Sequence, residues 1–197
     1  MIKKIKLIAM GSSTGGVEAL AAILPKLRPP LPPIVIVQHI PSGFSKMFAD
    51  RMNRESVITV KEAEDGETIK NDWAYIAPGG IHMKLIKVGE DLKIKCFMAP
   101  PVHSCRPAVD ILFFSVAELV GDAALGVILT GIGHDGAAGL LEMKKKGAVT
   151  LGQDEATSAV YGMPKSAFEC GAVMRQLALA AMPLAINSIA NKVKDIP

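Results

Sequence analysis

Short apolar runs alternate with helical segments along this chain. The clearest runs are Ile5 to Met10, Ile34 to Gln38 and Leu125 to Thr130, and a turn with glycine or proline follows each. Because the runs are apolar throughout, they are typical of strands that helices cover on both faces of a parallel sheet. The pattern predicts an α/β fold, a three-layer α/β/α sandwich with a mostly parallel, doubly wound sheet.

Segments with helical spacing of apolar residues separate these runs. Proline or glycine stands at several of their ends, where helices commonly begin or stop. The predicted helices are 16–27, 43–53, 107–120, 137–146 and 183–193. A further helix is expected to begin near Met163, because Pro164 fits the first helical turn. The alternation of strand and helix indicates βαβ units.

The pattern changes between residues 57 and 98. Two alternating segments, Met83 to Val88 and Leu92 to Cys96, flank the turn Gly89-Glu90-Asp91. They predict a β-hairpin inserted in the parallel frame. No repeat, linker or low-complexity tract divides the 197 residues, so we expect a single domain over 1–197.

Composition and charge narrow the possible function classes. The chain has 22 basic and 19 acidic residues, and its longest run of like charge is Lys144-Lys145-Lys146, which predicts no nucleic-acid partner. Its three cysteines, irregularly spaced, favour reduced thiols over a disulfide framework. The stretch Leu7 to Met10 is too short for a signal peptide, and no segment reaches the roughly 18 apolar residues of a membrane span. We expect a soluble, cytoplasmic protein without membrane insertion.

Residues able to do chemistry directly follow the three clearest strands. Gly11-Ser12-Ser13-Thr14-Gly15-Gly16 follows the first, His39-Ile40-Pro41 the second and Gly131-Ile132-Gly133-His134-Asp135-Gly136 the third. In an open α/β sheet the binding crevice lies at the carboxyl ends of the strands. We therefore expect a hydroxyl group, an imidazole and a carboxylate to converge on one edge.

Ser13 is the candidate nucleophile. Gly11 and Gly15 bracket it in the Gly-x-Ser-x-Gly pattern of a nucleophile elbow, whereas Ser12 lies outside that register. Such an elbow would expose Ser13 Oγ and direct the N–H of Thr14 toward an incoming carbonyl. The alternative interpretation is a phosphate-binding turn or a merely tight turn.

His39 is the candidate base, and Asp135 is the candidate carboxylate that orients it. His39 alone among the four histidines ends a strand of buried type. A hydrogen-bonded structural role is the plainer interpretation of a lone histidine, but the serine elbow on the adjacent strand favours the base. Adjacent side chains on a tight turn rarely pair, which argues against His134 as the partner of Asp135. Asp135 could instead be the N-cap of the helix that begins after Gly136.

A dinucleotide-binding oxidoreductase is the alternative function. Gly131-x-Gly133-x-x-Gly136 follows a strand, and Asp154 lies further along the chain, as in nucleotide-binding folds. Too few residues follow the next predicted strand, 148–152, for the rest of such a domain. Tyr161 and Lys165 have the spacing of short-chain dehydrogenases, but Pro164 leaves Tyr161 outside the helix.

Two further interpretations have less support. A docking module would present an apolar set to a partner helix, although methionines are more often core residues. That set is Met10, Met47, Met163 and Phe168. A zinc site would need ligand spacings that the chain lacks. The residues considered for it are His82, Cys96, His103 and Cys105.

Seven motifs follow one another along the chain and cover about residues 7–170. They are Gly11-Ser12-Ser13-Thr14-Gly15-Gly16, Gln38-His39-Ile40-Pro41-Ser42-Gly43-Phe44, Ala63-Glu64-Asp65-Gly66-Glu67, Tyr75-Ile76-Ala77-Pro78-Gly79, Arg106-Pro107-Ala108-Val109-Asp110, Thr130 to Gly139, and Gly162-Met163-Pro164. In this order they are far more specific than a single elbow. On these motifs the chain resembles the catalytic domain of the bacterial chemotaxis protein-glutamate methylesterases (CheB type).

The resemblance implies a serine hydrolase that removes methyl esters from glutamates on the cytoplasmic helices of chemoreceptors and releases methanol. Ser13 would attack, His39 would act as base and Asp135 would orient it, while backbone N–H groups of Thr14 and Ile132 would hold the oxyanion. No metal or cofactor is required. The resemblance also implies that some relatives deamidate glutamine.

Regulation is where the chain departs from the family. A receiver domain usually precedes the esterase, and none is expected here, since the first predicted strand starts close to Met1. A receiver-domain regulator would then act in trans. Arg106 could steer an acidic receptor helix, or could simply be a solvated or capping arginine.

Overall fold

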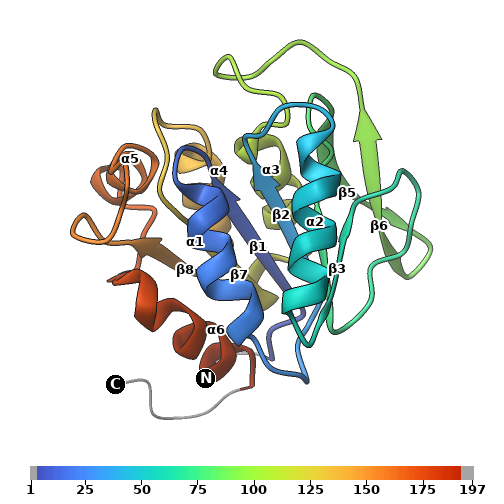
Figure 1. The fold of residues 1–197 in the computed structure, drawn as a ribbon, viewed down its shortest axis with the longest axis horizontal. Coiled ribbons are helices and arrows are strands. Elements are labelled where there is room, and N and C mark those ends of the chain that lie inside the picture. The colour runs from blue at the N-terminus through green and yellow to red at the C-terminus, as the bar shows by residue number, and fades with distance from the viewer. Residues whose placement is uncertain (1–3, 192–197) are drawn as a thin grey trace.

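The computed structural model describes residues 4–191 and is built on a parallel sheet (Figure 1). The sheet has seven strands in the order β3-β4-β2-β1-β7-β8-β9, and every neighbouring pair is parallel. The strands are β1 (Leu7–Ser12), β2 (Ile34–Gln38), β3 (Thr59–Glu62), β4 (Trp73–Ile76), β7 (Ala124–Ile128), β8 (Val149–Gln153) and β9 (Arg175–Leu177). This architecture confirms the predicted three-layer α/β/α sandwich with a doubly wound sheet.

The three clearest predicted strands lie side by side at the centre. β1 pairs with β2 on one edge, where Gly11 faces Val37, and with β7 on the other, where Gly11 faces Ile128. The chain leaves β1 toward β2, builds that half of the sheet, and then returns to β7 on the opposite side. The strand order therefore reverses at β1, and the carboxyl end of β1 is where such folds place a binding crevice.

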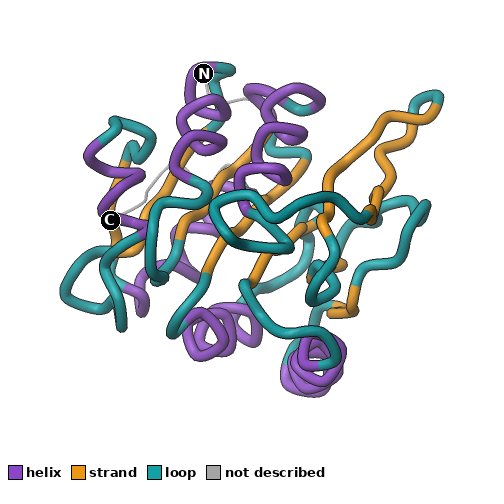
Figure 2. Tube along the Cα trace, turned by 90° about the horizontal axis from the view of Figure 1, so that it is seen from above, coloured by secondary structure: helices purple, strands orange, loops and turns teal. Residues whose placement is uncertain are grey.

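Helices cover both faces of the sheet (Figures 1 and 2). The helices are α1 (Gly16–Ile23), α2 (Phe44–Glu55), α3 (Val109–Leu119), α4 (Ala137–Lys145), α5 (Met163–Glu169) and α6 (Met182–Ala190). α1, α2 and α6 pack on one face and form the first core, and α3, α4 and α5 pack on the other face and form the second core. Side chains alternate between the two cores along β1: Ile8 lies in the first and Leu7 in the second.

The predicted end of the first helix is wrong for a local reason, and the start of the third differs slightly from the prediction. The first helix ends at Ile23 instead of continuing to residue 27, because Pro25 has no N–H to continue the helical ladder and lies in a 3₁₀ turn. The third begins at Val109, two residues later than predicted, because Ala108 is extended. The predicted end of the last helix, residue 193, lies outside the described residues. No helix within residues 4–191 combines the length and apolar character that crossing a membrane would need.

The predicted hairpin is confirmed. β5 (His82–Val88) and β6 (Asp91–Phe97) form a separate antiparallel sheet, and Leu85 and Ile94 bury their side chains in the second core beside α3. The edge strands β3 and β9 were not predicted, because they are short and carry polar residues such as Lys61 and Arg175 among few apolar ones.

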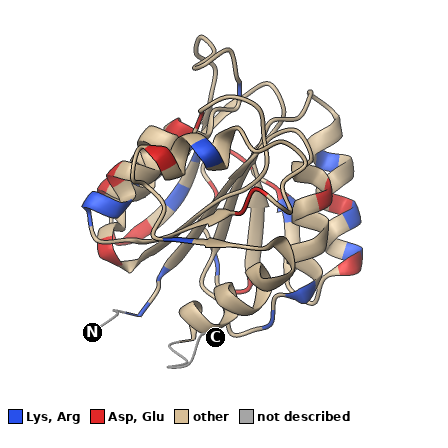
Figure 3. Ribbon diagram, turned by 90° about the vertical axis from the view of Figure 1, so that its left-hand side faces the viewer, with Lys and Arg blue, Asp and Glu red and all other residues tan. Residues whose placement is uncertain are grey.

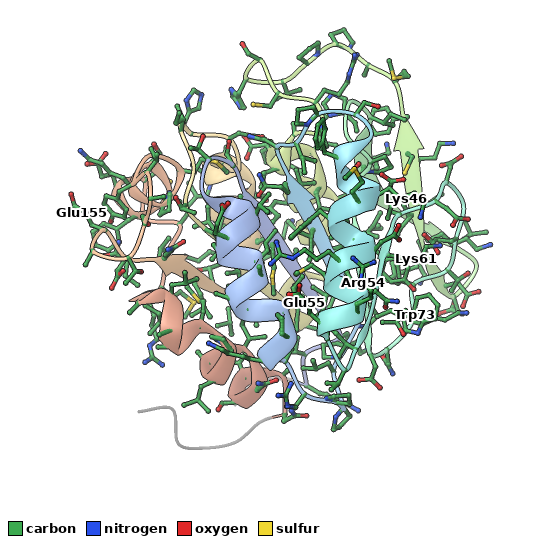
Figure 4. The ribbon with its side chains drawn as sticks, in the orientation of Figure 1. Lys46, Arg54, Glu55, Lys61, Trp73 and Glu155 are labelled. Atoms are coloured by element: carbon green, nitrogen blue, oxygen red, sulfur yellow. The ribbon has the colours of Figure 1, made fainter. Side chains whose placement is uncertain are left out.

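Charged residues of both signs are mixed on the helices that flank the sheet (Figure 3). Figure 4 labels three charged residues of α2, which are Lys46, Arg54 and Glu55, and Lys61 on β3 beside them. Lys61 Nζ lies 2.7 Å from Glu64 and 2.9 Å from Glu67, in loops that continue from β3. Glu64 is exposed and Lys61 and Glu67 are only partly buried. Ion pairs near the surface contribute little to stability, so the fold depends on its two apolar cores.

Replacing Phe113 tests the packing of α3 on the sheet. Phe113 is fully buried in the second core, whereas its neighbour Phe114 is 46% exposed. We expect Phe113→Ala to lower the free energy of unfolding by about 3–5 kcal/mol, because it leaves a cavity. Phe114→Ala should change it by no more than about 0.5 kcal/mol. Urea unfolding followed by circular dichroism measures both, and equal losses would contradict this packing.

Candidate active site

Three loops meet at the carboxyl ends of β1, β2 and β7. The Ser13 N–H donates to Thr130 O at 3.0 Å, which joins the loop after β1 to the loop after β7. The His39 N–H donates to Ser12 O, also at 3.0 Å, which joins the loop after β2 to β1. The lime-green connection from β6 to α3, residues 98–108, crosses over this same edge (Figure 1). The structure therefore brings together the segments that carry all the predicted site residues.

The turn after β1 distinguishes the two serines. Ser12 is fully buried, and its Oγ donates to Gln38 Oε1 at 2.6 Å. Ser13 lies in the turn and is partly exposed. Gly15 adopts a φ of +79°, and a Cβ there would lie 2.5 Å from the Ala159 side chain, so the position requires glycine. Of the pair, Ser13 is the one that a substrate can reach.

Gln38 ties the elbow to the base, and the sequence analysis missed this role. Its side-chain Nε2 donates to Ser13 O at 2.9 Å and to His39 O at 3.0 Å, while its Oε1 accepts from Ser12. A Cβ on Gly16 would overlap Oε1, so glycine at 16 leaves the space that this amide occupies. The only sequence signal was one polar residue at the end of an apolar strand. Gln38 is 2% exposed, so these hydrogen bonds are shielded from water.

His39 and Asp135 form a pair. His39 Nε2 lies 2.8 Å from Asp135 Oδ2, with His39 partly buried and Asp135 almost fully buried. This contact occupies Nε2 and leaves Nδ1 as the ring nitrogen available to another group. Within residues 4–191 the structure records no hydrogen bond between Ser13 Oγ and His39. The His39–Asp135 part of the predicted triad is thus hydrogen-bonded in this structure.

Asp135 also holds the beginning of α3. Its Oδ2 accepts from the Val109 N–H at 2.7 Å, and its Oδ1 accepts from the Asp110 N–H at 2.9 Å. These are among the N–H groups that a helix leaves without partners at its N-terminus. The N-cap of α4 is Gly136, and no side chain caps that helix. The interpretation of Asp135 as the cap of the helix that follows it is therefore wrong, because it caps a helix 25 residues earlier in the chain.

These contacts govern the charge of Asp135. Burial acts to raise its pKa, but hydrogen bonds from His39 and from the N–H groups of Asp110 and Val109 outweigh burial and leave the pKa below its ordinary value. Asp135 is therefore a carboxylate at neutral pH. A negative charge beside Nε2 stabilises a positive charge on the His39 ring.

A second carboxylate lies beside the first. Asp110, 3% exposed, accepts from the Gly139 N–H at 2.7 Å and pairs with His103 Nε2 at 3.0 Å. Burial and the charge of Asp135 raise the pKa of Asp110 despite those two contacts. His134 Nε2 lies 3.0 Å from the other ring nitrogen of His103. His134 thus belongs to a separate hydrogen-bonded series with His103 and Asp110. No hydrogen bond between the His134 and Asp135 side chains is found among the described residues.

The loop after β7 packs directly on the elbow. A Cβ on Gly131 would lie 2.7 Å from Ser13 Cβ, so only glycine permits this approach. Ile132 follows with its side chain 64% exposed. Among the described residues, neither the Thr14 N–H nor the Ile132 N–H donates a recorded hydrogen bond. The Thr14 N–H belongs to the elbow turn itself, and the Ile132 N–H belongs to the loop that packs against that turn.

The residues of the dinucleotide alternative have other roles. The side chain of Asp154 accepts from the Thr157 N–H at 3.0 Å and so stabilises its own turn. Tyr161 lies outside α5, as expected, and its hydroxyl contacts Gln176. Gly136 packs against the side chain of Val109 at the start of α3. Of these residues, only Gly136 belongs to the loop that carries Asp135.

Several of the other candidates also have structural roles. Met10 and Met163 are fully buried, which rules them out as part of a docking face. His82 is buried, accepts from the Ala108 N–H at 3.2 Å and donates to Pro100 O at 3.0 Å. Arg106 donates from Nη1 to Ala99 O at 2.9 Å and is half-buried, so it is not a freely solvated arginine. Its predicted steering of an acidic helix stays a prediction.

Comparison with known proteins gives one consistent result. Residues 8–186 match the family described as CheB methylesterase. The chain is 53% identical over 173 residues to a "Protein-glutamate methylesterase/protein-glutamine glutaminase" of Photorhabdus laumondii, covering 88% of this chain and 49% of that protein. A Caulobacter vibrioides protein with the same name and the number 1 is 51% identical over 186 residues, covering 94% of this chain and 54% of that protein. The chain spans about half the length of these curated relatives.

A solved structure agrees with the sequence comparisons. The crystal structure of the Thermotoga maritima CheB methylesterase catalytic domain superposes with a TM-score of 0.91 at 38% identity. The match covers 95% of this chain and 100% of that one. These similarities do not support the dinucleotide-binding alternative.

The two buried aspartates should respond differently to replacement by asparagine. In Asp135→Asn the amide NH₂ would face one of the two α3 N–H groups, so we expect a loss of about 1–3 kcal/mol in the free energy of unfolding at pH 7. Because the pKa of Asp135 is lowered, its stabilising contribution is present above the unfolded pKa and is lost as pH falls through the folded pKa. The difference in the free energy of unfolding between Asp135→Asn and the parent chain should therefore become smaller below about pH 4.

Asp110→Asn is the matched control. Its charged form is disfavoured by burial at pH 7, and an asparagine oxygen can still accept from the Gly139 N–H, so the loss should be smaller than for Asp135→Asn. Urea unfolding at several pH values measures both variants. A larger loss for Asp110→Asn, or a loss for Asp135→Asn that grows toward low pH, would contradict the assignment of charge.

Proposed function

Because the chain belongs to the CheB methylesterase family, we propose that it is a protein-glutamate methylesterase, a serine hydrolase that demethylates glutamate methyl esters on methyl-accepting chemoreceptors. The observation that carries the proposal is the pairing of His39 with a buried, ionised Asp135 next to an accessible serine in an elbow turn. This set of groups is what acyl transfer through a serine requires.

In the proposed reaction Ser13 is the nucleophile. Its Oγ attacks the ester carbonyl as His39 Nδ1 accepts the proton, and Asp135 holds the opposite side of the ring and stabilises the imidazolium. The imidazolium then protonates the departing methoxide, and methanol leaves an acyl-enzyme. Water, activated by the same histidine, hydrolyses the acyl-enzyme and releases the glutamate carboxylate. The Ser13 Oγ and His39 Nδ1 come into contact when substrate is bound, since such contacts tighten in the complex.

The oxyanion of each tetrahedral intermediate needs donors that are already in place. We assign them to the N–H groups of Thr14 and Ile132, which flank Ser13 on two loops. Because only main-chain groups take part, the identity of the exposed side chain at 132 has little influence on this role.

Glutamine deamidation is the second proposed activity. The relatives in Photorhabdus and Caulobacter carry both activities in their names. The chemistry uses the same acyl-enzyme, with ammonia in place of methanol as the leaving group. The substrates proposed for both reactions are the cytoplasmic helices of chemoreceptors. A cytoplasmic location and regulation by a receiver domain stay predictions.

Labelling with a serine-directed phosphonate tests the nucleophile. Ser13 lies in the accessible turn, whereas Ser12 is buried with its hydroxyl on Gln38. Mass spectrometry of peptides should find one adduct, on Ser13. The Ser13→Ala variant should stay unlabelled, and Ser12→Ala should still react. An adduct on Ser12 in the folded protein would overturn the assignment.

Methanol release from a methylated receptor fragment tests the activity and the base. His39→Ala should reduce the rate by at least about 10²-fold, because the general base is lost. His134→Ala is the control, since its recorded partner is His103 and not Asp135, and it should stay close to the parent rate. Circular dichroism checks that each variant folds. An inactive His134→Ala with an active His39→Ala would show that the triad is wrongly assigned, and no methanol from the parent chain would refute the esterase.

A further inference from the structure

Cys105 lies beside the proposed base and has no part in the mechanism above. It belongs to the connection between β6 and α3 and is partly buried. Its Sγ, a ring nitrogen of His39 and a carboxylate oxygen of Asp135 all lie within 4.8 Å of one another. A thiol, an imidazole and a carboxylate from three separate segments thus converge on one point.

The backbone holds Cys105 in this place. Val102 and Cys105 exchange two hydrogen bonds, from the Val102 N–H at 3.0 Å and from the Cys105 N–H at 2.8 Å, and so close a two-residue turn. The turn residues His103 and Ser104 have φ angles of +50° and +61°, which are unfavourable for residues with side chains. His103 is in turn fixed to Asp110 at 3.0 Å. The turn keeps its strained shape because contacts at both ends specify it.

The donor set matches the chemistry of zinc. Thiolate sulfur, imidazole nitrogen and carboxylate oxygen bind Zn²⁺ at about 2.3, 2.0 and 2.1 Å, which separates the ligand atoms of a tetrahedral site by roughly 3.4–3.6 Å. The three atoms already lie within 4.8 Å of one another, and the 2.8 Å contact between His39 Nε2 and Asp135 Oδ2 would lengthen when a metal ion takes the place of the shared proton. The N–H groups of Val109 and Asp110 fix the Asp135 carboxylate. In metal sites, hydrogen bonds from groups behind the ligands orient the ligands in the same way.

We propose that Cys105, His39 and Asp135 form a binding site for Zn²⁺, and that zinc bound there inhibits the enzyme by occupying the catalytic base. The inhibitory effect rests on the proposed esterase function, whereas the metal site does not. Binding converts the Cys105 thiol to a thiolate and releases one proton to solvent. Burial and the charge of Asp135 raise the pKa of that thiol, so zinc has to displace a bound proton.

A neighbouring group of ligands fits less well. His103, Asp110 and Asp135 also have ligand atoms within 4.8 Å of one another. However, two of its three residues, Asp110 and Asp135, are almost fully buried carboxylates, whereas the first set has only one buried residue. His39 and Cys105 are both partly exposed, which leaves a path for the ion and a fourth position for water.

Cobalt titration tests the site without relying on activity. Co²⁺ replaces Zn²⁺ in such sites, and its bond to a thiolate gives a charge-transfer absorption in the near ultraviolet. The full chain should show this band at one equivalent of Co²⁺. Cys105→Ala should lose the band and weaken Co²⁺ binding more than about tenfold. Cys170→Ala removes an exposed cysteine elsewhere in the chain. This variant should keep the absorption band and bind Co²⁺ as tightly as the parent chain.

Inhibition by Zn²⁺ completes the test. Zinc should stop methanol release by the parent chain, and a chelator should restore it. Cys105→Ala should be active without metal and more than about tenfold less sensitive to zinc, while His103→Ala and Cys170→Ala should stay sensitive. Binding without a thiolate band, or equal inhibition of the parent and Cys105→Ala, would overturn the site. A cobalt site that depends on Cys105 in a chain without esterase activity would instead uphold the metal site and refute the proposed function.

Discussion

The carboxylate of Asp135 is the group on which the arrangement of the site depends. It is buried at the end of the sheet, where an unpaired negative charge would be very costly. Two N–H groups of α3 and the ring of His39 offset that cost. One charge therefore joins the loops after β2 and β7 to the start of a helix on the second face. The helix N-terminus, which favours a negative charge, makes the same carboxylate a stable partner for a protonated imidazole.

The neutral amide of Gln38 supplies the matching constraint on the serine side. Its two N–H groups bind the carbonyl groups of Ser13 and His39, and its oxygen binds the hydroxyl of Ser12. The main chains on either side of the reacting groups are thus fixed through one buried side chain. Ser13 Oγ itself remains free of these bonds, as a nucleophile must be. The scaffold is rigid around a hydroxyl that can still turn toward substrate.

The central sheet and the loops of the site could be predicted because their signals are local. Strands covered on both faces are apolar throughout, and the residues that follow three neighbouring strands must share an edge. The short edge strands β3 and β9 were not predicted, since half-exposed residues there alternate too briefly to give a pattern. The role of Asp135 in capping α3 joins residues far apart in the chain, and no spacing rule reveals such a contact. The same is true of Cys105, which reaches His39 only because an irregular connection of residues 98–108 crosses the site.

The overlap between Gly16 and Gln38 has a consequence for how such sequences can change over generations. A side chain at position 16 would occupy the space of the Gln38 amide oxygen. Shortening residue 38 would leave the buried hydroxyl of Ser12 and two loop carbonyl groups without their shared partner. A substitution at either position alone would therefore create an overlap or remove these hydrogen bonds. We therefore expect the two positions, 22 apart in the printed sequence, to be retained together or replaced together.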